Sequence, residues 1–259
     1  MPPSTTDLAA VASEAAQSPG DYLRKAFRDG HVDGEYDDLD VKAVADREAQ
    51  TRIRAVVNDH YPDHAFDGEE SATTTDSPYR WVVDPLDGTN NFASGYPKFA
   101  TAVAVIYKDN PVACAIYEPI VDALYVAERD GGATYNGDPL RATVSLPLDH
   151  GTVALVVGLS AVTDPALADQ ARRLETTLRE HCKRVVTTWA PCVDWGLAAR
   201  GSIEGLVGFH PDGYEYYAGS LLASESGLAV VDTVEENGSY VGGVDPATTD
   251  RLVEVVGDR

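Results

Sequence analysis

The chain has 259 residues, 44% of them hydrophobic, which is enough to bury the core of one large domain or of two packed halves. Its 42 acidic residues outnumber the 20 basic ones, and the net charge of −22 argues against nucleic acid and anionic membranes as partners. The sequence has no apolar run of roughly 20 residues that could span a membrane and no secretory leader, so we expect a cytoplasmic protein.

Two further features of the composition bear on the environment of the protein. The acidic excess predicts a very salty cytoplasm, where dissolved ions screen the repulsion between surface carboxylates. The plainer alternative is an ordinary acidic protein. The cysteines are odd in number and lack metal-type spacing, so we expect free thiols in a reducing compartment at Cys114, Cys182 and Cys192.

Helical periodicity dominates the start of the chain. The first predicted helix covers residues 7 to 28, with Thr5 or Thr6 as its N-cap. A second covers residues 42 to 60 and is closed by Pro62, which cannot continue a helix.

The rest of the first half is predicted to be loops and strands. Residues 30–40 and 66–78 are rich in Asp, Gly, Ser and Thr and are predicted loops. From residue 79 the sequence becomes apolar or alternating, which predicts strands of one antiparallel sheet at residues 81–83, 101–108, 112–119 and 123–129.

The second half alternates between predicted strands and helices, which indicates α/β layering. Strands are expected at residues 152–159, 184–188, 203–209 and 228–232. Helices are expected at residues 164–181, 191–200, 215–226 and 246–256. We therefore expect one compact unit in which residues 1–150 carry helices and a strand-rich sheet, and residues 151–259 form an α/β half.

The stretch RWVVDPLDGTNNF, residues 80–92, admits two interpretations. Pro, Asp, Gly and Asn are turn residues, so one is a surface turn. The other is a cation site, because Asp84 ends a buried strand and Asp87 follows across a Pro-fixed turn. Both carboxylates and the Leu86 carbonyl could then face one space, as Mg²⁺ requires. Glu69 and Glu70, just upstream, favour the second interpretation.

Other motifs do not fit this spacing. A helix–loop–helix calcium site needs oxygens at positions 1, 3 and 5 of its loop. A phosphatase of the haloacid dehalogenase type needs its two aspartates two residues apart, whereas Asp84 and Asp87 are three apart. No glycine-rich loop ends in Lys followed by Ser or Thr, so a P-loop nucleotide site is not expected.

GEES at residues 68–71 together with WVVDPLDGTNNF closely resembles the metal-site motifs of the inositol monophosphatase family. Residues 190–201 and 220–227 resemble two helices of the second half of that family. The resemblance implies an α+β fold, a layered α-β-α-β-α sandwich with an antiparallel-rich first sheet and an α/β second half. It also implies a homodimer and a phosphatase with two or three Mg²⁺ ions per site and some sensitivity to Li⁺.

The resemblance implies a role for each matching residue. The implied Mg²⁺ ligands are Glu70, Asp84, the carbonyl of Leu86 and Asp87. Thr89 and Glu70 would position the attacking water. Asp46 would support Thr89 or hold a third metal. Asp87, Gly88 and Thr89 would contact the phosphate.

Two positions depart from the family pattern. Glu215 stands where the family has the aspartate that binds the second metal, and Asp212 is an alternative ligand. Gly208 stands where the inositol enzymes have a glutamate that meets substrate hydroxyls, which weakens the expectation of inositol phosphate. His210, nearby, is a candidate substrate contact.

The sequence therefore predicts a Mg²⁺-dependent phosphatase of small sugar or polyol phosphate monoesters. Inositol-1-phosphate and fructose-1,6-bisphosphate are the main candidate substrates, and a 3′-phosphoadenosine-type nucleotide is the alternative. A further alternative is a family member that binds metal or polyol without catalysis.

Overall fold

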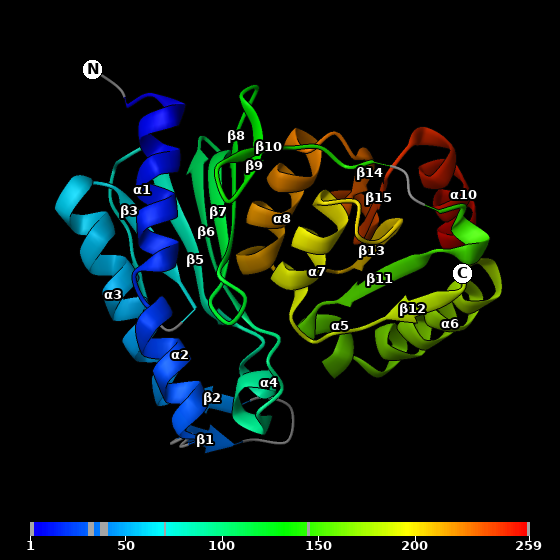
Figure 1. Ribbon diagram of the computed structural model, residues 1–259, viewed down its shortest axis with the longest axis horizontal. Helices are drawn as coiled ribbons and strands as arrows, with labels where there is room; N and C mark the ends of the chain where they lie inside the picture. Colours follow the sequence, from blue (N-terminus) through cyan, green and yellow to red (C-terminus); the bar gives the residue numbers. More distant parts are fainter. Residues whose placement is uncertain (1–2, 31–33, 37–40, 70, 144–145, 258–259) are drawn as a thin grey trace.

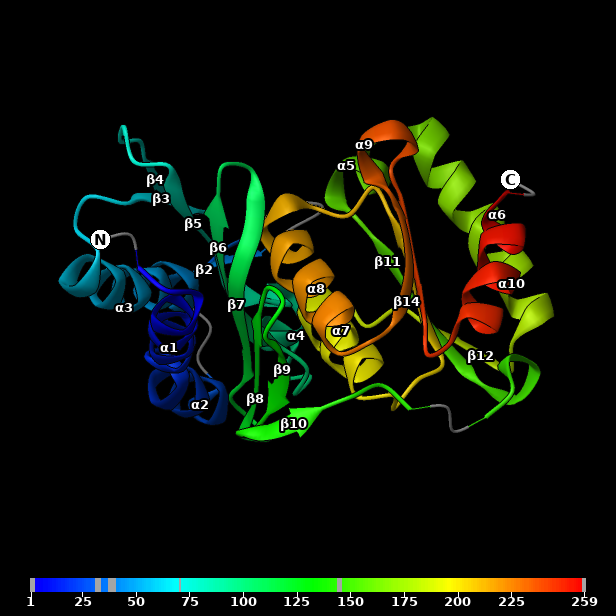
Figure 2. The same cartoon turned by 90° about the horizontal axis from the view of Figure 1, so that it is seen from above.

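The computed structural model describes residues 3–257 except 31–33, 37–40, 70 and 144–145. These residues form five layers in the order helix, sheet, helix, sheet, helix (Figures 1 and 2). The expected α-β-α-β-α sandwich is confirmed. Among the described residues, no helix has the length and apolar character needed to cross a membrane.

The first layer consists of α1 (Thr5–Gln17), α2 (Gly20–Asp29) and α3 (Val44–His60). The single helix predicted over residues 7 to 28 is wrong, because Pro19 has no N–H to donate to the Ala15 carbonyl. The Ser18 hydroxyl donates to that carbonyl instead, at 2.8 Å. The N-cap is Ser4, whose Oγ accepts from the Asp7 N–H at 3.1 Å, and not Thr5 or Thr6.

The second layer is an eight-stranded sheet with the order β10-β9-β8-β7-β6-β5-β3-β4. Among the described strands of this sheet, only the β3–β5 pair is parallel, and β5 to β8 are antiparallel neighbours, as predicted. Its strands are β3 (Ala65–Gly68), β4 (Ser71–Thr73), β5 (Tyr79–Asp87), β6 (Ala100–Tyr107), β7 (Asn110–Glu118), β8 (Ala123–Glu128), β9 (Gly132–Tyr135) and β10 (Asp138–Leu140). The predicted loop at residues 66–78 thus contains most of β3 and the short edge strand β4. A separate two-stranded sheet, β1 (Gly34–Tyr36) and β2 (Val41–Ala43), lies near α4 (Thr89–Ser94).

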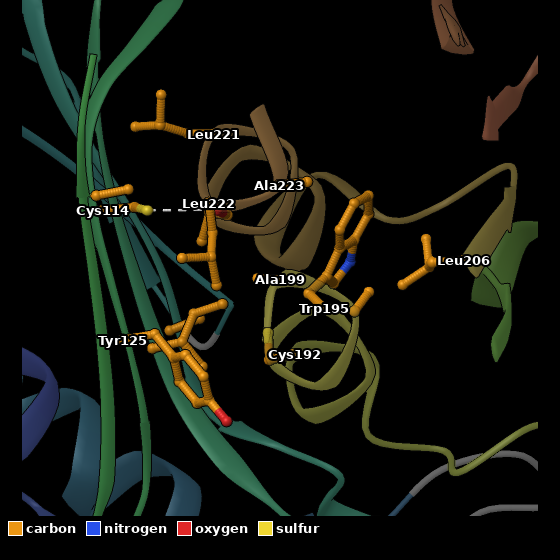
Figure 3. Packing of buried hydrophobic residues seen from close by; sticks show 14 of the residues in the cluster. Cys114, Tyr125, Cys192, Trp195, Ala199, Leu206, Leu221, Leu222 and Ala223 are labelled. Atoms are coloured by element: carbon orange, nitrogen blue, oxygen red, sulfur yellow. Dashed lines mark hydrogen bonds between the residues drawn. The ribbon is translucent and has the colours of Figure 1, made fainter. Parts of the chain in front are cut away.

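The middle layer is the helix pair α7 (Pro191–Ala199) and α8 (Gly213–Glu225), which packs against both sheets. The two helices approach closely at Gly219, where a Cβ would overlap the Trp195 ring. Figure 3 shows Tyr125 and Cys114 of the first sheet on one side of the pair and Leu206 of the second sheet on the other. One continuous apolar core therefore joins the two sheets through the helix pair.

The fourth layer is a five-stranded sheet with the order β12-β11-β13-β15-β14, covered outside by α6 (Pro165–His181) and α10 (Pro246–Gly257). Its strands are β11 (Thr152–Val157), β12 (Arg184–Val186), β13 (Gly205–Phe209), β14 (Ala229–Thr233) and β15 (Ser239–Gly243). β11 is parallel to both its neighbours, and β15 is antiparallel to both of its own. The sequence did not predict β15 or the short helices α5 (Leu159–Thr163) and α9 (Val234–Asn237).

Candidate active site

A bulge in β5 brings two aspartates together. Asp84 pairs with Ala102 of β6 and Asp87 with Ala100, so two residues of β5, Pro85 and Leu86, lie opposite the single residue Thr101 of β6. In a regular strand, residues three apart face opposite sides, and the extra residue of a bulge cancels this alternation. One carboxylate oxygen of each aspartate and the Sγ of Cys192 all lie within 4.8 Å of one another.

The turn after β5 requires glycine at position 88. Gly88 has a φ of +85°, and a Cβ there would lie 2.9 Å from the Lys98 carbonyl oxygen and 3.0 Å from the Ala190 Cβ. The Asn91 amide fixes the turn, because its Nδ2 donates to the carbonyls of Lys98 and Thr188 at 2.8 Å each. The peptide groups of Gly88 and Thr89 are thereby held at the edge of the cavity described below.

Phe92 anchors the other side of this turn. Its buried ring packs against Phe27 and Phe99, with centroid separations of 5.8 Å and 5.0 Å. Together with the bonds made by Asn91, these contacts pack the turn against the core.

Thr89 links this turn to the first helical layer. Its Oγ1 lies 3.0 Å from Asp46 Oδ2 on α3 and 2.9 Å from the Leu86 carbonyl oxygen. Asp46 is buried, although most aspartates at a helix start are exposed caps. The structure thus brings Asp46, Leu86 and Thr89 together.

The first turn of α8 brings a carboxylate from the second half of the chain. Glu215 is buried, and its Oε1 accepts from the Asp212 N–H at 3.4 Å. Asp212 turns one oxygen, Oδ2, to the Leu159 N–H at 2.7 Å. Both side chains line the cavity, so the structure leaves both candidates for the second metal in place.

The acidic side chains repel one another in this buried space. The pKa of Asp84 is raised well above its ordinary value, first by burial and then by Glu69, Asp87, Asp46 and Glu215. Burial is also the main reason that the pKa values of Asp87 and Glu215 are raised. Two like charges about 4 Å apart repel by about 4 kcal/mol at an effective dielectric constant of about 20. A divalent cation removes this conflict, so the donor set fits Mg²⁺.

The cavity has a volume of about 490 Å³, within the range of small-molecule sites. It is lined by the acidic cluster, Glu69, Asp84, Asp87, Asp212 and Glu215, and by parts of the second sheet and of α6. Asp46 is not among the described residues that line it. Glu70 lies outside the described residues, and its exposed neighbour Glu69 lines the cavity.

His210 does not line this cavity among the described residues. Its ring lies against Gly238 and packs edge-on to Phe209, with the ring centroids 4.7 Å apart. The structure therefore gives no support to His210 as a substrate contact.

Two cavity residues, Asp194 and Trp189, were not singled out from the sequence. Asp194, on α7, is buried, accepts a hydrogen bond from the Thr188 hydroxyl at 2.8 Å, and has its pKa raised to about 7 by burial. Trp189 has a φ of +58°, a conformation that costs a non-glycine residue about 1–3 kcal/mol. The predicted strand at 184–188 ends at Val186, and the Thr-Trp-Ala-Pro sequence that follows was the available signal for a turn.

Comparison with known proteins places this arrangement in a family. Residues 4–255 match the model of the Inositol monophosphatase family. The chain belongs to the inositol monophosphatase family. Its relatives in this family include a fructose-1,6-bisphosphatase/inositol-1-monophosphatase of Aquifex aeolicus, 29% identical over 84% of this chain and 82% of that protein. Another is the Nus factor SuhB of Escherichia coli K12, 30% identical over 86% of this chain and 84% of that protein.

Solved structures of this family have the same fold. The extragenic suppressor protein suhB of Bartonella henselae superposes with a TM-score of 0.86 at 25% identity, covering 96% of this chain and 98% of that one. The inositol monophosphatase of Anabaena superposes with a TM-score of 0.83 at 21% identity, covering 98% and 96%. The mixed α+β architecture is therefore that of the inositol monophosphatases.

Proposed function

We propose that this inositol monophosphatase family member is a Mg²⁺-dependent phosphatase that hydrolyses small phosphate monoesters by attack of water. One observation carries the proposal. Buried carboxylates from β5 and α8 line one cavity, and the buried Asp46 of α3 is bonded to Thr89 at its edge. Burial first, and then the charges of these carboxylates and of Glu69, raise the pKa of Asp84. Such convergence is unfavourable without cations and is therefore typical of a metal site.

The metal ligands in this proposal are Asp84, Asp87, the Leu86 carbonyl, Glu215 and, outside the described residues, Glu70. When bound, two or three Mg²⁺ ions would make a water nucleophilic near neutral pH and neutralise charge on the leaving oxygen.

The chain itself would orient the reactants. The Thr89 hydroxyl, donating to Asp46, presents its lone pairs to the attacking water, with Glu70 as the second partner of that water. The N–H groups of Gly88 and Thr89 would hold the phosphoryl oxygens, and positioning of this kind supplies most of the catalysis in phosphoryl transfer.

The alcohol part of the substrate has two candidate classes. The names of the relatives support a sugar or polyol phosphate, namely inositol-1-phosphate or fructose-1,6-bisphosphate. Gly208, where the inositol enzymes have a hydroxyl-binding glutamate, weakens the case for inositol-1-phosphate, and a 3′-phosphoadenosine-type nucleotide is the alternative.

The similarity to proteins named Nus factor SuhB keeps a role without catalysis as a further candidate. We also propose that the protein is a cytoplasmic homodimer in which residues 1–150 carry the motifs and residues 151–259 complete the site.

Phosphate release from a panel of these esters, with Mg²⁺ or with EDTA, tests the proposal. We expect hydrolysis that requires Mg²⁺ and that Asp87→Asn nearly abolishes. The variant should fold, because the amide oxygen can still accept the Cys192 N–H, which now donates to Asp87 at 2.8 Å. Asp59→Asn, on the exposed end of α3, is the matched control and should retain activity. Near-normal hydrolysis by Asp87→Asn would refute the proposed site.

A further inference from the structure

Two exposed apolar side chains line the cavity from different parts of the fold. Among the described residues, large apolar side chains are rarely exposed, yet Trp189 is 52% exposed and Leu159, on α5, is 40% exposed. The other two tryptophans, Trp81 and Trp195, are fully buried. An exposed aromatic residue at a cavity is a feature of ligand recognition, because it offers a large, rigid contact surface.

The backbone of Trp189 is held in its strained conformation by contacts to the turn at Gly88. The Thr188 Oγ1 accepts from the Ala190 N–H at 3.2 Å, which closes a turn around Trp189. Asn91 donates to the Thr188 carbonyl, and the Trp189 carbonyl oxygen lies 3.3 Å from the position of a Cβ on Gly88. The neighbours therefore fix the Trp189 backbone next to Gly88, and persistent strain of this kind points to a function.

The cavity lining beyond the acidic cluster is largely aliphatic. It includes Leu155, Val157, Leu159, Val162 and Ala171, and among its polar members are Thr187, Asp194, and Arg172 and Glu175 of α6. A polyol placed against the aliphatic part would lose hydrogen bonds to water without replacing them. A flat conjugated ring fits such a surface, and a volume of about 490 Å³ leaves room for it beside a phosphate.

We propose that Trp189 is a specificity-determining residue that stacks on the flat ring of the substrate's alcohol, so that the cavity favours nucleoside phosphates over phosphate esters of plain sugars. The proposal rests on the phosphatase function above for the phosphate end and adds the class of alcohol. Stacking on an aromatic side chain depends on the ring face and tolerates different bases.

A matched pair of ligands tests this inference. Adenosine 5′-monophosphate and ribose 5-phosphate share the sugar and the phosphate and differ in the base. We expect a KM for the nucleotide lower by roughly 5- to 150-fold, the range that corresponds to stacking energies of about 1–3 kcal/mol. Trp189→Phe should keep most of this preference. Trp189→Leu, which stays apolar but is not aromatic, should lose most of it. Equal KM values in the wild type, or an unchanged preference in Trp189→Leu, would overturn the proposal.

Fluorescence gives a readout that does not need turnover. Because Trp189 is the exposed tryptophan, adenosine 5′-monophosphate should quench the emission of the Asp46→Asn variant, in which slow turnover preserves the ligand. Ribose 5-phosphate should not, and Trp189→Phe should remove the response. Quenching without hydrolysis of any ester in the wild type would support the ring site while refuting the phosphatase function. Hydrolysis with no quenching would refute the ring site alone. The emission could also stay unchanged on adding the nucleotide and shift when the protein is diluted. That result would mean that a second copy of the chain covers Trp189, which also overturns the proposal.

Discussion

A hydrogen bond of 3.0 Å joins Thr89 to Asp46 across 43 positions of the chain. Asp46 lies on α3 in the outer helical layer, and Thr89 is the first residue of α4, directly after the β5 bulge. Since a hydroxyl carries one proton, donation to Asp46 leaves the Thr89 lone pairs available to an incoming water. A helix that lies far from this turn in the sequence thus sets the orientation of the Thr89 hydroxyl.

Asp46→Asn is therefore expected to lower kcat by about 10²-fold or more with a smaller change in KM, because general-base positioning contributes about 10²–10⁴-fold. Steady-state kinetics with saturating Mg²⁺ checks this. Asp59→Asn on the same helix is exposed and should behave as the wild type. A kcat within twofold of the wild type for Asp46→Asn would show that catalysis does not need the negative charge of this acceptor.

Asp194 predicts a pH dependence of stability. Its pKa in the folded protein is about 7 against an ordinary value of 3.8, so the folded state keeps a proton that the unfolded chain has lost. Its contribution to the free energy of unfolding is full below about pH 4 and is lost as the pH rises toward about 7. The loss amounts to roughly 4 kcal/mol at most, at about 1.36 kcal/mol per pKa unit.

Denaturant unfolding of the wild type and Asp194→Asn, in EDTA and at a series of pH values, measures this loss. The stability of the wild type relative to the variant should fall between pH 4 and pH 7. Parallel curves over that interval would show that the carboxyl ionises normally in the folded protein.

The helices and strands with strong local periodicity were predicted from the sequence, and those with weak periodicity were missed. α3, α6 and the strands β5 to β8 have clear periodicity, and the sequence located them. β3, β4 and β15 have three to five residues each and owe their conformation to pairing with β5, β13 and β14, which no local pattern reveals. The break between α1 and α2 had a visible signal, Ser18-Pro19, that helical periodicity masked.

The predictability of the site divides in the same way. Asp84, Leu86 and Asp87 sit within four residues, and their spacing alone indicates shared chemistry. The conformation of Trp189 could not be predicted from the sequence, because it depends on a hydrogen bond from Asn91 to the carbonyl of Thr188, 97 positions away. The position of His210 was also beyond reach, because its ring rests on Gly238 of a different strand connection.

The net charge of −22 predicts a dependence on salt. Ion pairs such as Lys25–Asp29 and Arg179–Glu175 are largely exposed and contribute little, so repulsion among the surface carboxylates dominates. We expect the unfolding temperature and the activity to rise as KCl is raised to molar concentration, because added ions screen this repulsion. Full activity and stability in dilute buffer, with no gain from KCl, would show that the protein is merely acidic.

The strain at Trp189 predicts an unusual order of stability. Glycine adopts a positive φ freely whereas alanine does not. Trp189→Gly should therefore be more stable than Trp189→Ala by roughly 1 kcal/mol, although glycine is normally the more destabilising replacement. Thermal unfolding checks the order. Trp195→Ala, at a buried position, should cost about 3–5 kcal/mol. A Trp189→Ala variant as stable as Trp189→Gly would contradict the strain.

α8 carries a hydrogen-bonded carboxylate in its first turn and another in its last turn. Glu215 faces the cavity from the first turn, and Glu225, in the last turn, accepts the N–H groups of Asp130 and Gly132 at 2.8 Å and 2.9 Å. The two residues are separated by about 15 Å of continuous helix at about 1.5 Å per residue. The last turn of the helix is thus fixed to the β8–β9 hairpin by hydrogen bonds. A mutation in that hairpin would tilt the helix and displace Glu215 at its other end.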